Sequence, residues 1–335
     1  MVDTATPTPM RDRVDSAKVT RPGIPPLRRG GPPPRRRTSY TLPTRPAVPR
    51  QLAPRDARWW IGAAVLVVSM LLIGFVVHAT LFSWLQHSRS QDIAFQDLRT
   101  SLAKADIPVG QLDVNEDLVA LGTPVSLLSI PEIGLTETVV EGSTASVLRT
   151  GPGHRRDSVM PGQAGTSVIL GRQTTYGGPF RSVGQLVPGD EITITTGQGV
   201  HIYTVFGVRR NDDPLPEVLK AGAGRLELIT ADGLALFPGG ALHIDAELTS
   251  DVQPTPTKVM TYQALPKDER AMGQDGEAWF AALTALAVFI GAGITLWWLW
   301  RSWGRWHTWL IGTPIMLALG VTTADAVMAA LPNLI

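Results

Sequence analysis

Three long apolar runs, at residues 59–82, 277–300 and 308–331, constrain this chain more than any other feature of its sequence. Each run is about as long as a helix must be to cross a hydrocarbon core of about 30 Å. Tryptophans, which favour the membrane–water interface, lie near the ends of the runs. The sequence therefore predicts three transmembrane helices. The first is expected to act as a signal anchor, because it begins too far along the chain for a cleaved signal peptide.

The segment before the first run, residues 1–58, is basic and rich in proline. It holds thirteen Lys or Arg, four Asp or Glu and twelve of the 27 prolines, which gives it a net formal charge of +9. It has too little apolar side chain to offset the entropy cost of ordering, so we expect it to be disordered. An arginine-rich run can bind nucleic acid, but its place beside an apolar span favours anionic lipid headgroups instead.

The orientation of the chain follows from its basic segments. If the three spans alternate, the tail and the turn at residues 301–307 lie on the same side of the membrane. The positive-inside rule places both in the cytoplasm. The rest of the chain, which carries a net formal charge of −8 after residue 58, then has its large central part outside. The C-terminus is also expected to be extracytoplasmic.

Two ionisable residues fall inside the predicted spans, His78 in the first and Asp325 in the third. Both lie near the outer ends of their spans, so their depths are similar. A carboxylate inside a membrane is costly unless it is paired. We hypothesise that His78 and Asp325 meet across a helix interface. The alternative is that each reaches separately into the headgroup region.

The hydrophobic period changes between the first two spans. Residues 83–119 start with a helical pattern that continues the first span, and they end as a linker. Short runs with a period of two follow at residues 123–130, 137–141, 166–170, 190–196, 200–208, 225–230 and 241–248. Glycine- and proline-rich turns separate them, so residues 120–249 are predicted to form an all-β barrel or sandwich. A polar linker, residues 250–276, returns the chain to the membrane.

Several spaced blocks within this β region match a known family. They are Ile130-Pro-Glu-Ile-Gly-Leu, Gly151-Pro-Gly-His154, Thr174-Thr-Tyr-Gly-Gly-Pro-Phe180, Leu186-Val-Pro-Gly-Asp190 and Leu226-Glu-Leu-Ile-Thr230. In this order they resemble the sortases, and most closely the actinobacterial class E type. The resemblance implies a closed sortase-like β-barrel of about eight strands on the outer face of a Gram-positive membrane. It also implies cleavage of a sorting signal and transfer of the acyl group to an amine.

The resemblance also locates the catalytic residues of the family, and all three positions are substituted. The histidine belongs where this chain has Arg172, and the cysteine where it has Ala231. The arginine aligns with Ala241. Because the 335 residues contain no cysteine, a thiolate nucleophile is excluded. We therefore expect no catalytic residue, and the chain is predicted to be a pseudoenzyme.

The remaining candidates for chemistry are weak. A threonine hydroxyl needs an adjacent base, and no histidine is predicted beside Thr230. His154 is expected to have a structural role in a loop. His201 and His243 are expected to be cross-strand or surface residues. No His or carboxylate cluster has the spacing of metal ligands, so we expect no metal and no cofactor.

Without its chemistry, the barrel is predicted to keep a peptide groove. The candidate groove residues are Arg172, Gln173, Tyr176, Phe180, Thr230 and Asp232. A fixed guanidinium beside aromatic rings suits a carboxylate or an extended acidic peptide. The alternative is that Arg172 pairs with Asp232 and closes the cleft.

The leading hypothesis is a catalytically inactive sortase-like membrane protein that acts as a binding or scaffold subunit at the cell envelope. Its expected partner is another membrane protein or a secreted envelope protein, because three spans favour lateral association where one would anchor a domain. An extended peptide is the expected ligand of the groove. One alternative is a sortase-type transpeptidase or hydrolase with non-standard catalytic residues. Another is a peptide sensor that signals through its helices to the tail.

Overall fold

The computed structural model describes residues 57–335 apart from 235–236 and 303–304. The predicted basic tail, residues 1–58, lies outside the described residues except for its last two positions. Its predicted disorder and its contact with lipid headgroups therefore stay predictions.

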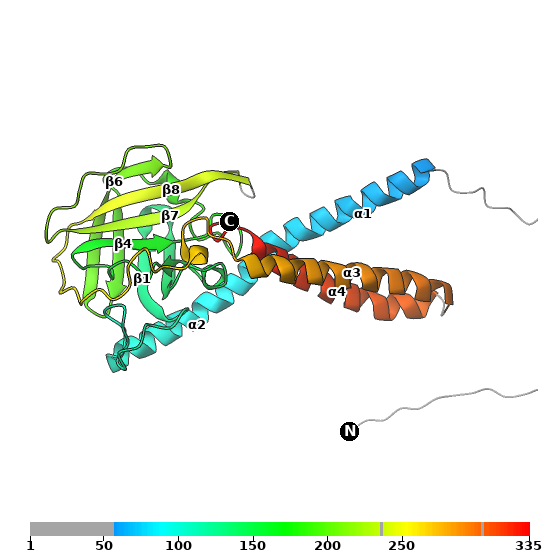
Figure 1. Ribbon diagram of the computed structural model, residues 1–335, viewed down its shortest axis with the longest axis horizontal. Helices are drawn as coiled ribbons and strands as arrows, with labels where there is room; N and C mark the ends of the chain where they lie inside the picture. The colour runs from blue at the N-terminus through cyan, green and yellow to red at the C-terminus, as the bar shows by residue number, and fades with distance from the viewer. Residues whose placement is uncertain (1–56, 235–236, 303–304) are drawn as a thin grey trace, which may run out of the picture. The chain divides into compact units, whose positions relative to one another are not determined.

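The first predicted span belongs to a helix that continues well beyond it. Helix α1 (Ala57–Val77), a π-helical turn (His78–Phe82) and helix α2 (Ser83–Lys104) follow one another without a break. Figure 1 shows this long helix running from α1 to the flank of the β domain. There Gln91 of α2 bonds both main-chain groups of Thr138, accepting from its amide at 2.7 Å and donating to its carbonyl at 3.1 Å. These bonds fix α2 to the β domain.

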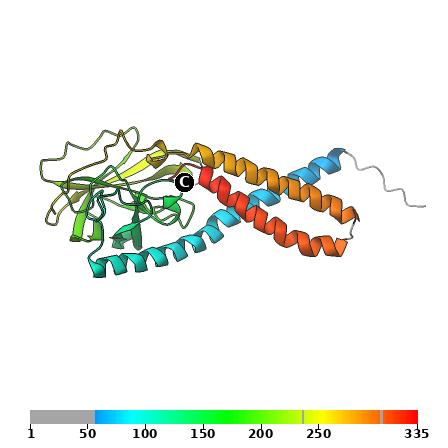
Figure 2. The same ribbon diagram turned by 60° about the horizontal axis from the view of Figure 1, so that its bottom comes forward.

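The other two spans form a pair of antiparallel helices. They are α3 (Gly276–Ser302) and α4 (Arg305–Ala330), which lie side by side in both Figure 1 and Figure 2. Three helices of the described chain are long and apolar enough to cross a membrane. Large apolar side chains cover the outer surfaces of these helices, as expected of helices in contact with lipid.

Eight strands form the β domain. They are β1 (Pro124–Ile130), β2 (Leu135–Glu141), β3 (Gly153–His154), β4 (Gly165–Leu170), β5 (Glu191–Thr196), β6 (Gly199–Arg210), β7 (Gly224–Leu234) and β8 (Phe237–Leu248). They close into a barrel in the order β1-β2-β3-β4-β7-β8-β6-β5. The β2–β3 and β4–β7 pairs are parallel, and the other pairs are antiparallel. The predicted closed all-β barrel of about eight strands is confirmed.

Part of the barrel wall is apolar on both faces. Along β7, Leu226 and Leu228 belong to the main core inside the barrel. Because successive strand residues point to opposite faces, Ile229 and Ala231 face outward, and there they belong to a second apolar cluster. In β4, Ile169 likewise faces the main core while its neighbours join the second cluster. A strand buried on both faces needs a cover on its outer side.

The structure differs from the predicted organisation in three places. The strand β3 has only two residues, too few to give a periodic signal in the sequence. The strands β7 and β8 extend beyond their predicted ends at residues 230 and 241, and Gly233, with a positive φ of 102°, lies at a shift in their register. The predicted polar linker, 250–276, packs against the barrel instead of running free, and the Gln253 amide donates to the Gly162 carbonyl at 2.8 Å.

Candidate binding groove

The two alanines predicted to replace catalytic residues lie directly opposite one another. Ala231 of β7 pairs with Ala241 of β8 in the antiparallel register. Both side chains are buried, with 0% and 5% exposed, on the outer face of the barrel wall. They form the floor of a shallow apolar site whose other members are Leu148, Val168, Leu170, Ile229 and Leu334. The methyl side chains of these alanines cannot act as acid, base or nucleophile, so they contribute only a small apolar surface.

Residues 333–335, which we call the plug, lie on this floor. The Leu334 side chain is fully buried in the apolar site, and Ile335 is 2% exposed. The main-chain amide of Gln173 donates to the Leu334 carbonyl at 2.9 Å. The plug follows α4 and lies where Figure 1 marks the end of the chain, beside the barrel.

Arg172 binds the far end of the plug. Its Nη1 donates to the Ile335 carbonyl at 2.8 Å, and its Nη2 donates to the Ala145 carbonyl at 2.7 Å. Thr175 Oγ1 donates to the same Ile335 carbonyl at 2.5 Å. Arg172 is fully buried, and burial lowers its pKa to about 10. It therefore keeps its charge at neutral pH, and its guanidinium donates to oxygens of Thr175, Ile335 and Ala145.

Residues 267–273, which we call the strap, cover the plug from the other side. The Asn333 amide donates to the Gly273 carbonyl at 3.0 Å. Asn333 Nδ2 donates to the carbonyls of Ser143 and Arg270 at 2.7 and 2.9 Å. The strap is anchored by Glu269, whose side chain is 1% exposed.

Glu269 is held by a two-pronged ion pair. Arg156 donates from Nε and Nη2 to its two carboxylate oxygens, at 3.0 and 2.5 Å. The Ser143 hydroxyl donates to its main-chain carbonyl at 2.6 Å. Bonding to Glu269 is the largest influence on the Arg156 guanidinium and raises its pKa. Removing one partner of a pair at this depth is far more destabilising than removing one partner of an exposed pair.

Of the six predicted groove residues, only Arg172 and Gln173 contact the plug. Phe180 belongs to the main core inside the barrel. Thr230 lies on β7 next to Ala231, so strand alternation turns it inward, and its hydroxyl donates to the Gly171 carbonyl at 2.9 Å. The alternation of β7 in the sequence was a signal that could have removed Thr230 from the predicted groove.

Tyr176 lies beside Arg172, with the guanidinium carbon 5.1 Å from the centre of its ring, while Asp232 has its partner elsewhere. The Tyr176 amide donates to Ser83 Oγ at 3.0 Å, where the π-helical turn meets α2, and its ring packs against Ala79 and other helix residues. Asp232 pairs with Arg210 at 3.0 Å. The suggested pairing of Arg172 with Asp232 is therefore wrong. What closes the groove is the plug.

Sequence reasoning missed the plug and the strap. The apolar pair Leu334-Ile335, beyond the end of the third predicted span, was a signal for the plug. The strap gave no comparable signal, because its anchoring residue, Glu269, resembles any charged residue of an exposed linker. Only its ion pair with Arg156, 113 residues away in the sequence, distinguishes Glu269 from an exposed linker residue.

A second cluster has the atoms of a nucleophile–base–acid triad. Ser158 Oγ lies 3.0 Å from His154 Nε2, and His154 Nδ1 lies 2.8 Å from Glu141 Oε2. However, Nε2 also lies 2.9 Å from the Val159 carbonyl, which only accepts, so Nε2 carries a proton and cannot take one from Ser158. The Ser158 hydroxyl instead donates to the Arg155 carbonyl at 2.7 Å.

The protonation of His154 agrees with these bonds. Burial lowers its pKa, but the attraction of Glu141 and their hydrogen bond outweigh burial, so the pKa is raised above its ordinary 6.5. His154 is fully buried and carries positive charge as the partner of Glu141. It lies in the short strand β3, where the sequence predicted a loop, and its role is structural.

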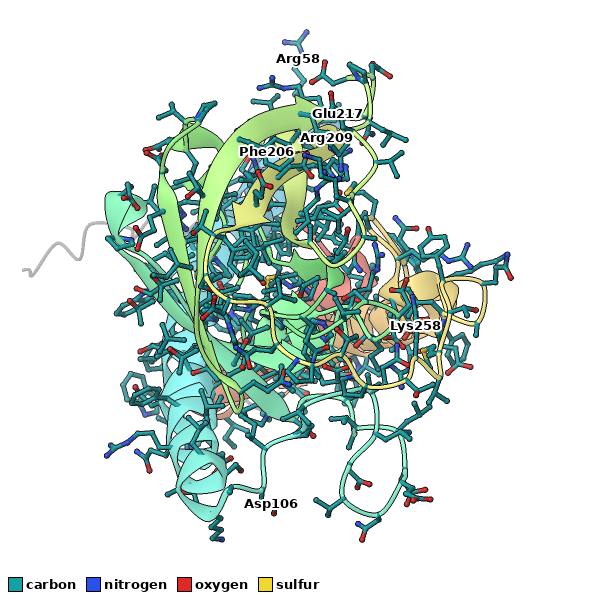
Figure 3. All side chains as sticks on the ribbon, turned by 90° about the vertical axis from the view of Figure 1, so that its left-hand side faces the viewer. Arg58, Asp106, Phe206, Arg209, Glu217 and Lys258 are labelled. Carbon is teal, nitrogen blue, oxygen red and sulfur yellow. The ribbon has the colours of Figure 1, made fainter. Side chains whose placement is uncertain are left out.

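The other two candidate histidines are tied to neighbouring strands. His201 Nε2 lies 2.8 Å from Thr196 Oγ1, and burial lowers the His201 pKa. His243 Nδ1 lies 2.8 Å from Glu227 Oε1 on the outer face of the barrel. Glu227 also pairs with Arg209 of β6. Figure 3 shows Arg209 on the opposite side of the barrel from Asp106. Within the part of the chain that the structure describes, no group of three or more His, Asp or Glu side chains is placed to hold a metal ion.

His78 and Asp325 are brought together by the helices. His78 Nε2 lies 2.9 Å from Asp325 Oδ1. His78 begins the π-helical turn, a distortion that often occurs at functional sites. The contact joins α4 to the first helix ten residues before the plug ends. Asp325 near the end of α4 and the plug just after α4 therefore lie on one short stretch of the chain.

The barrel matches known proteins. Residues 128–234 match the family model described as a sortase domain. Sortase D of Bacillus subtilis is 30% identical over 108 residues, which cover 32% of this chain and 53% of that protein. Sortase SrtE1 of Streptomyces coelicolor is 25% identical over 155 residues, which cover 44% of this chain and 42% of that protein. The chain thus spans about half of the length of these curated relatives.

A solved structure is also similar to this chain. The structure of sortase E from Streptomyces avermitilis is 28% identical, covers 39% of this chain and 91% of that chain, and has a TM-score of 0.34. The family match covers β1 to β7, including the strand that carries Ala231. Over residues 128–234, the β-barrel of this chain is therefore similar to a sortase domain.

Proposed function

We propose that this chain is a catalytically inactive sortase-like membrane protein that binds another membrane or secreted protein at the cell envelope. The observation that carries the proposal is the composition of the groove floor. Ala231 and Ala241 face one another where the family resemblance places the nucleophile and the oxyanion-stabilising arginine, and the 335 residues contain no cysteine.

Acyl transfer needs a nucleophile, a base and a donor to the oxyanion. On the groove floor, the alanines supply none of these. Arg172 is a strong donor, but its Nη1 and Nη2 groups are bonded to Ile335, Thr175 and Ala145. In the Ser158 cluster, the proton on His154 Nε2 faces the wrong way for general-base catalysis. These features support binding rather than turnover.

The topology predicted from the basic segments supports a role outside the cell. With the basic segments in the cytoplasm, the barrel and the plug lie on the outer side of the membrane, together with any secreted partner. One helix would be enough to attach the barrel to a membrane. This chain has three, with the α3–α4 hairpin and a polar contact between His78 and Asp325. An anchor of this kind suits lateral contact with another membrane protein.

Two measurements test the proposal. Purified full-length chain, incubated with Leu-Pro-x-Thr and Leu-Ala-x-Thr peptides and an amine acceptor, is expected to give no cleaved or transferred product by mass spectrometry. An active sortase serves as the positive control. Product that disappears in a Ser158→Ala or Arg172→Gln variant would refute catalytic inactivity.

The second measurement concerns the partner. Tagged full-length chain, purified from its native membrane in mild detergent, is expected to retain a stoichiometric membrane or secreted protein. The same purification with Ala241→Leu, which fills the groove floor, separates binding at the groove from binding at the helices. Recovery of the chain alone from both preparations would count against a scaffold role.

A further inference from the structure

The β7–β8 hairpin ends in two large apolar side chains that are open to solvent. Leu234, at the end of β7, is 75% exposed, and Phe237, at the start of β8, is 80% exposed. They pair with one another across the hairpin, and we call these two residues the hairpin tip. Large apolar side chains gathered at one exposed place mark a contact surface.

The hairpin tip lies at the end of the barrel that faces the helices. Leu334, four residues after the end of α4 at Ala330, packs in one cluster with Ala231 of β7. Leu234 follows Ala231 by three residues, so it lies about 10 Å further along the strand at about 3.3 Å per residue. Figure 1 shows the free end of this hairpin on the side of the barrel from which α3 and α4 extend.

The helices place the membrane surface at this end of the barrel. Trp279 lies in the first turn of α3, and tryptophan favours the membrane–water interface. The strap ends at residue 273 and α3 begins at residue 276, while α4 ends at Ala330, just before the plug. These connections are short, so the barrel lies close to the outer surface of the bilayer. The interfacial layer there is about 5–8 Å deep, within reach of a projecting hairpin.

The charges at the base of the tip do not form a basic patch. Arg210 pairs with Asp232 at 3.0 Å, and its main-chain amide donates to the Asp213 carboxylate at 2.7 Å. One guanidinium therefore stands beside two carboxylates, so attraction to anionic headgroups adds little here. Leucine and phenylalanine are the side chains that interfacial segments bury at the boundary between headgroups and acyl chains.

We infer that the hairpin tip inserts into the outer surface of the lipid bilayer, as a further membrane contact beside the three helices. Its partner is the boundary between headgroups and acyl chains, whatever the charge of the lipid. Because β7 and β8 also carry Ala231 and Ala241, insertion of the tip fixes the angle of the groove floor to the membrane. The inference goes beyond the proposed function and holds whether or not the groove binds a protein.

The absence of cysteine from the chain makes a site-specific test possible. The full-length variant Leu234→Cys, labelled with bimane, is placed in phosphatidylcholine nanodiscs that hold one chain each. Lipids brominated in the upper part of their acyl chains are expected to quench this label at least half as strongly as a label at the exposed span residue Leu81. The control is Val200, which is 59% exposed. It lies at the far end of the barrel, because Tyr203 of β6 pairs with Leu248, where β8 ends, and its label should be quenched little.

Two changes test whether the contact is apolar insertion. Adding Phe237→Ser to the labelled Leu234→Cys chain is expected to reduce quenching at least threefold. Adding Val200→Ser, which also replaces an exposed apolar side chain, should leave quenching unchanged. Replacing half of the phosphatidylcholine with phosphatidylglycerol should have no effect either.

Quenching at position 234 no stronger than at position 200 would mean that the tip stays in water, and the inference would fail. Quenching that persists in Phe237→Ser would place the tip near the membrane without apolar insertion, and would also overturn it. Quenching that required phosphatidylglycerol would assign the contact to charge and have the same effect. These measurements involve neither peptide turnover nor partner capture, so their failure is distinct from failure of the proposed function.

Discussion

Replacing Glu269 with Gln is expected to make local opening of the strap about 10- to 100-fold more frequent. Arg156 donates twice to the carboxylate, and the side chains are 1% and 16% exposed for Glu269 and Arg156. Hydrogen bonds to charged groups contribute about 1.5–3 kcal/mol. The isosteric amide keeps the shape and one acceptor but loses the charge. Since about 1.4 kcal/mol corresponds to a tenfold change, local opening of the strap should become more frequent by the stated factor.

Hydrogen exchange of the full-length chain in detergent measures this opening. The informative amides are those of Gly273, which donates to the Arg270 carbonyl at 2.8 Å, and of Asn333, which donates to Gly273 at 3.0 Å. Both are expected to exchange faster in Glu269→Gln, while amides of the barrel core keep their rates. Exchange from locally opened states reports the free energy of opening.

The matched control is Asp232→Asn. Asp232 also pairs with an arginine, Arg210, but the two side chains are 31% and 64% exposed. Pairs exposed to this degree contribute about 0–1 kcal/mol, so the Gly273 and Asn333 amides should change little. If the two variants accelerated these amides equally, the role given to the buried pair with Arg156 would be refuted.

Two further predictions concern titratable pairs. Because the pKa of His154 is raised above 6.5, its stabilisation is complete below that value and is lost as pH rises through the folded-state pKa. Chemical unfolding between about pH 6 and 9 should show falling stability, and Glu141→Gln should flatten the profile; an unchanged slope would contradict this. Asp325→Asn should weaken the contact of α4 with His78 by about 1 kcal/mol, seen as less cross-linking between cysteines placed in the two helices; undiminished cross-linking would disprove it.

Features with a local signal could be predicted from the sequence. The barrel strands alternate with a period of two, and turn residues separate them, so all seven predicted ranges correspond to strands, and only the end of β7 and the start of β8 differ by more than two residues. The long apolar runs identify the three helices on length alone. The residues that distinguish the groove, Ala231 and Ala241, were located by family resemblance and not by any physical pattern.

What could not be predicted depends on contacts between distant segments. The strap needs the pairing of Glu269 with Arg156, 113 residues apart. The plug needs Arg172 and Ile335 to meet, 163 residues apart. The contact of His78 with Asp325, 247 residues apart, was hypothesised only because equal depth in a membrane restricts which residues can meet. In the aqueous part of the chain no such restriction applies. The sequence therefore suggested Asp232, which is closer in sequence than Ile335, as the partner of Arg172.

The alanine floor and the plug depend on one another. A side chain with polar groups at position 231 or 241 would need partners within a site that is closed to water, and Leu334 offers none. Conversely, the alanines are too small to shield their neighbours on the outer face of the barrel wall. Without a cover, Val168, Leu170 and Ile229 would face solvent. Leu334 shields this apolar surface from water, and the small side chains of Ala231 and Ala241 leave room for Leu334.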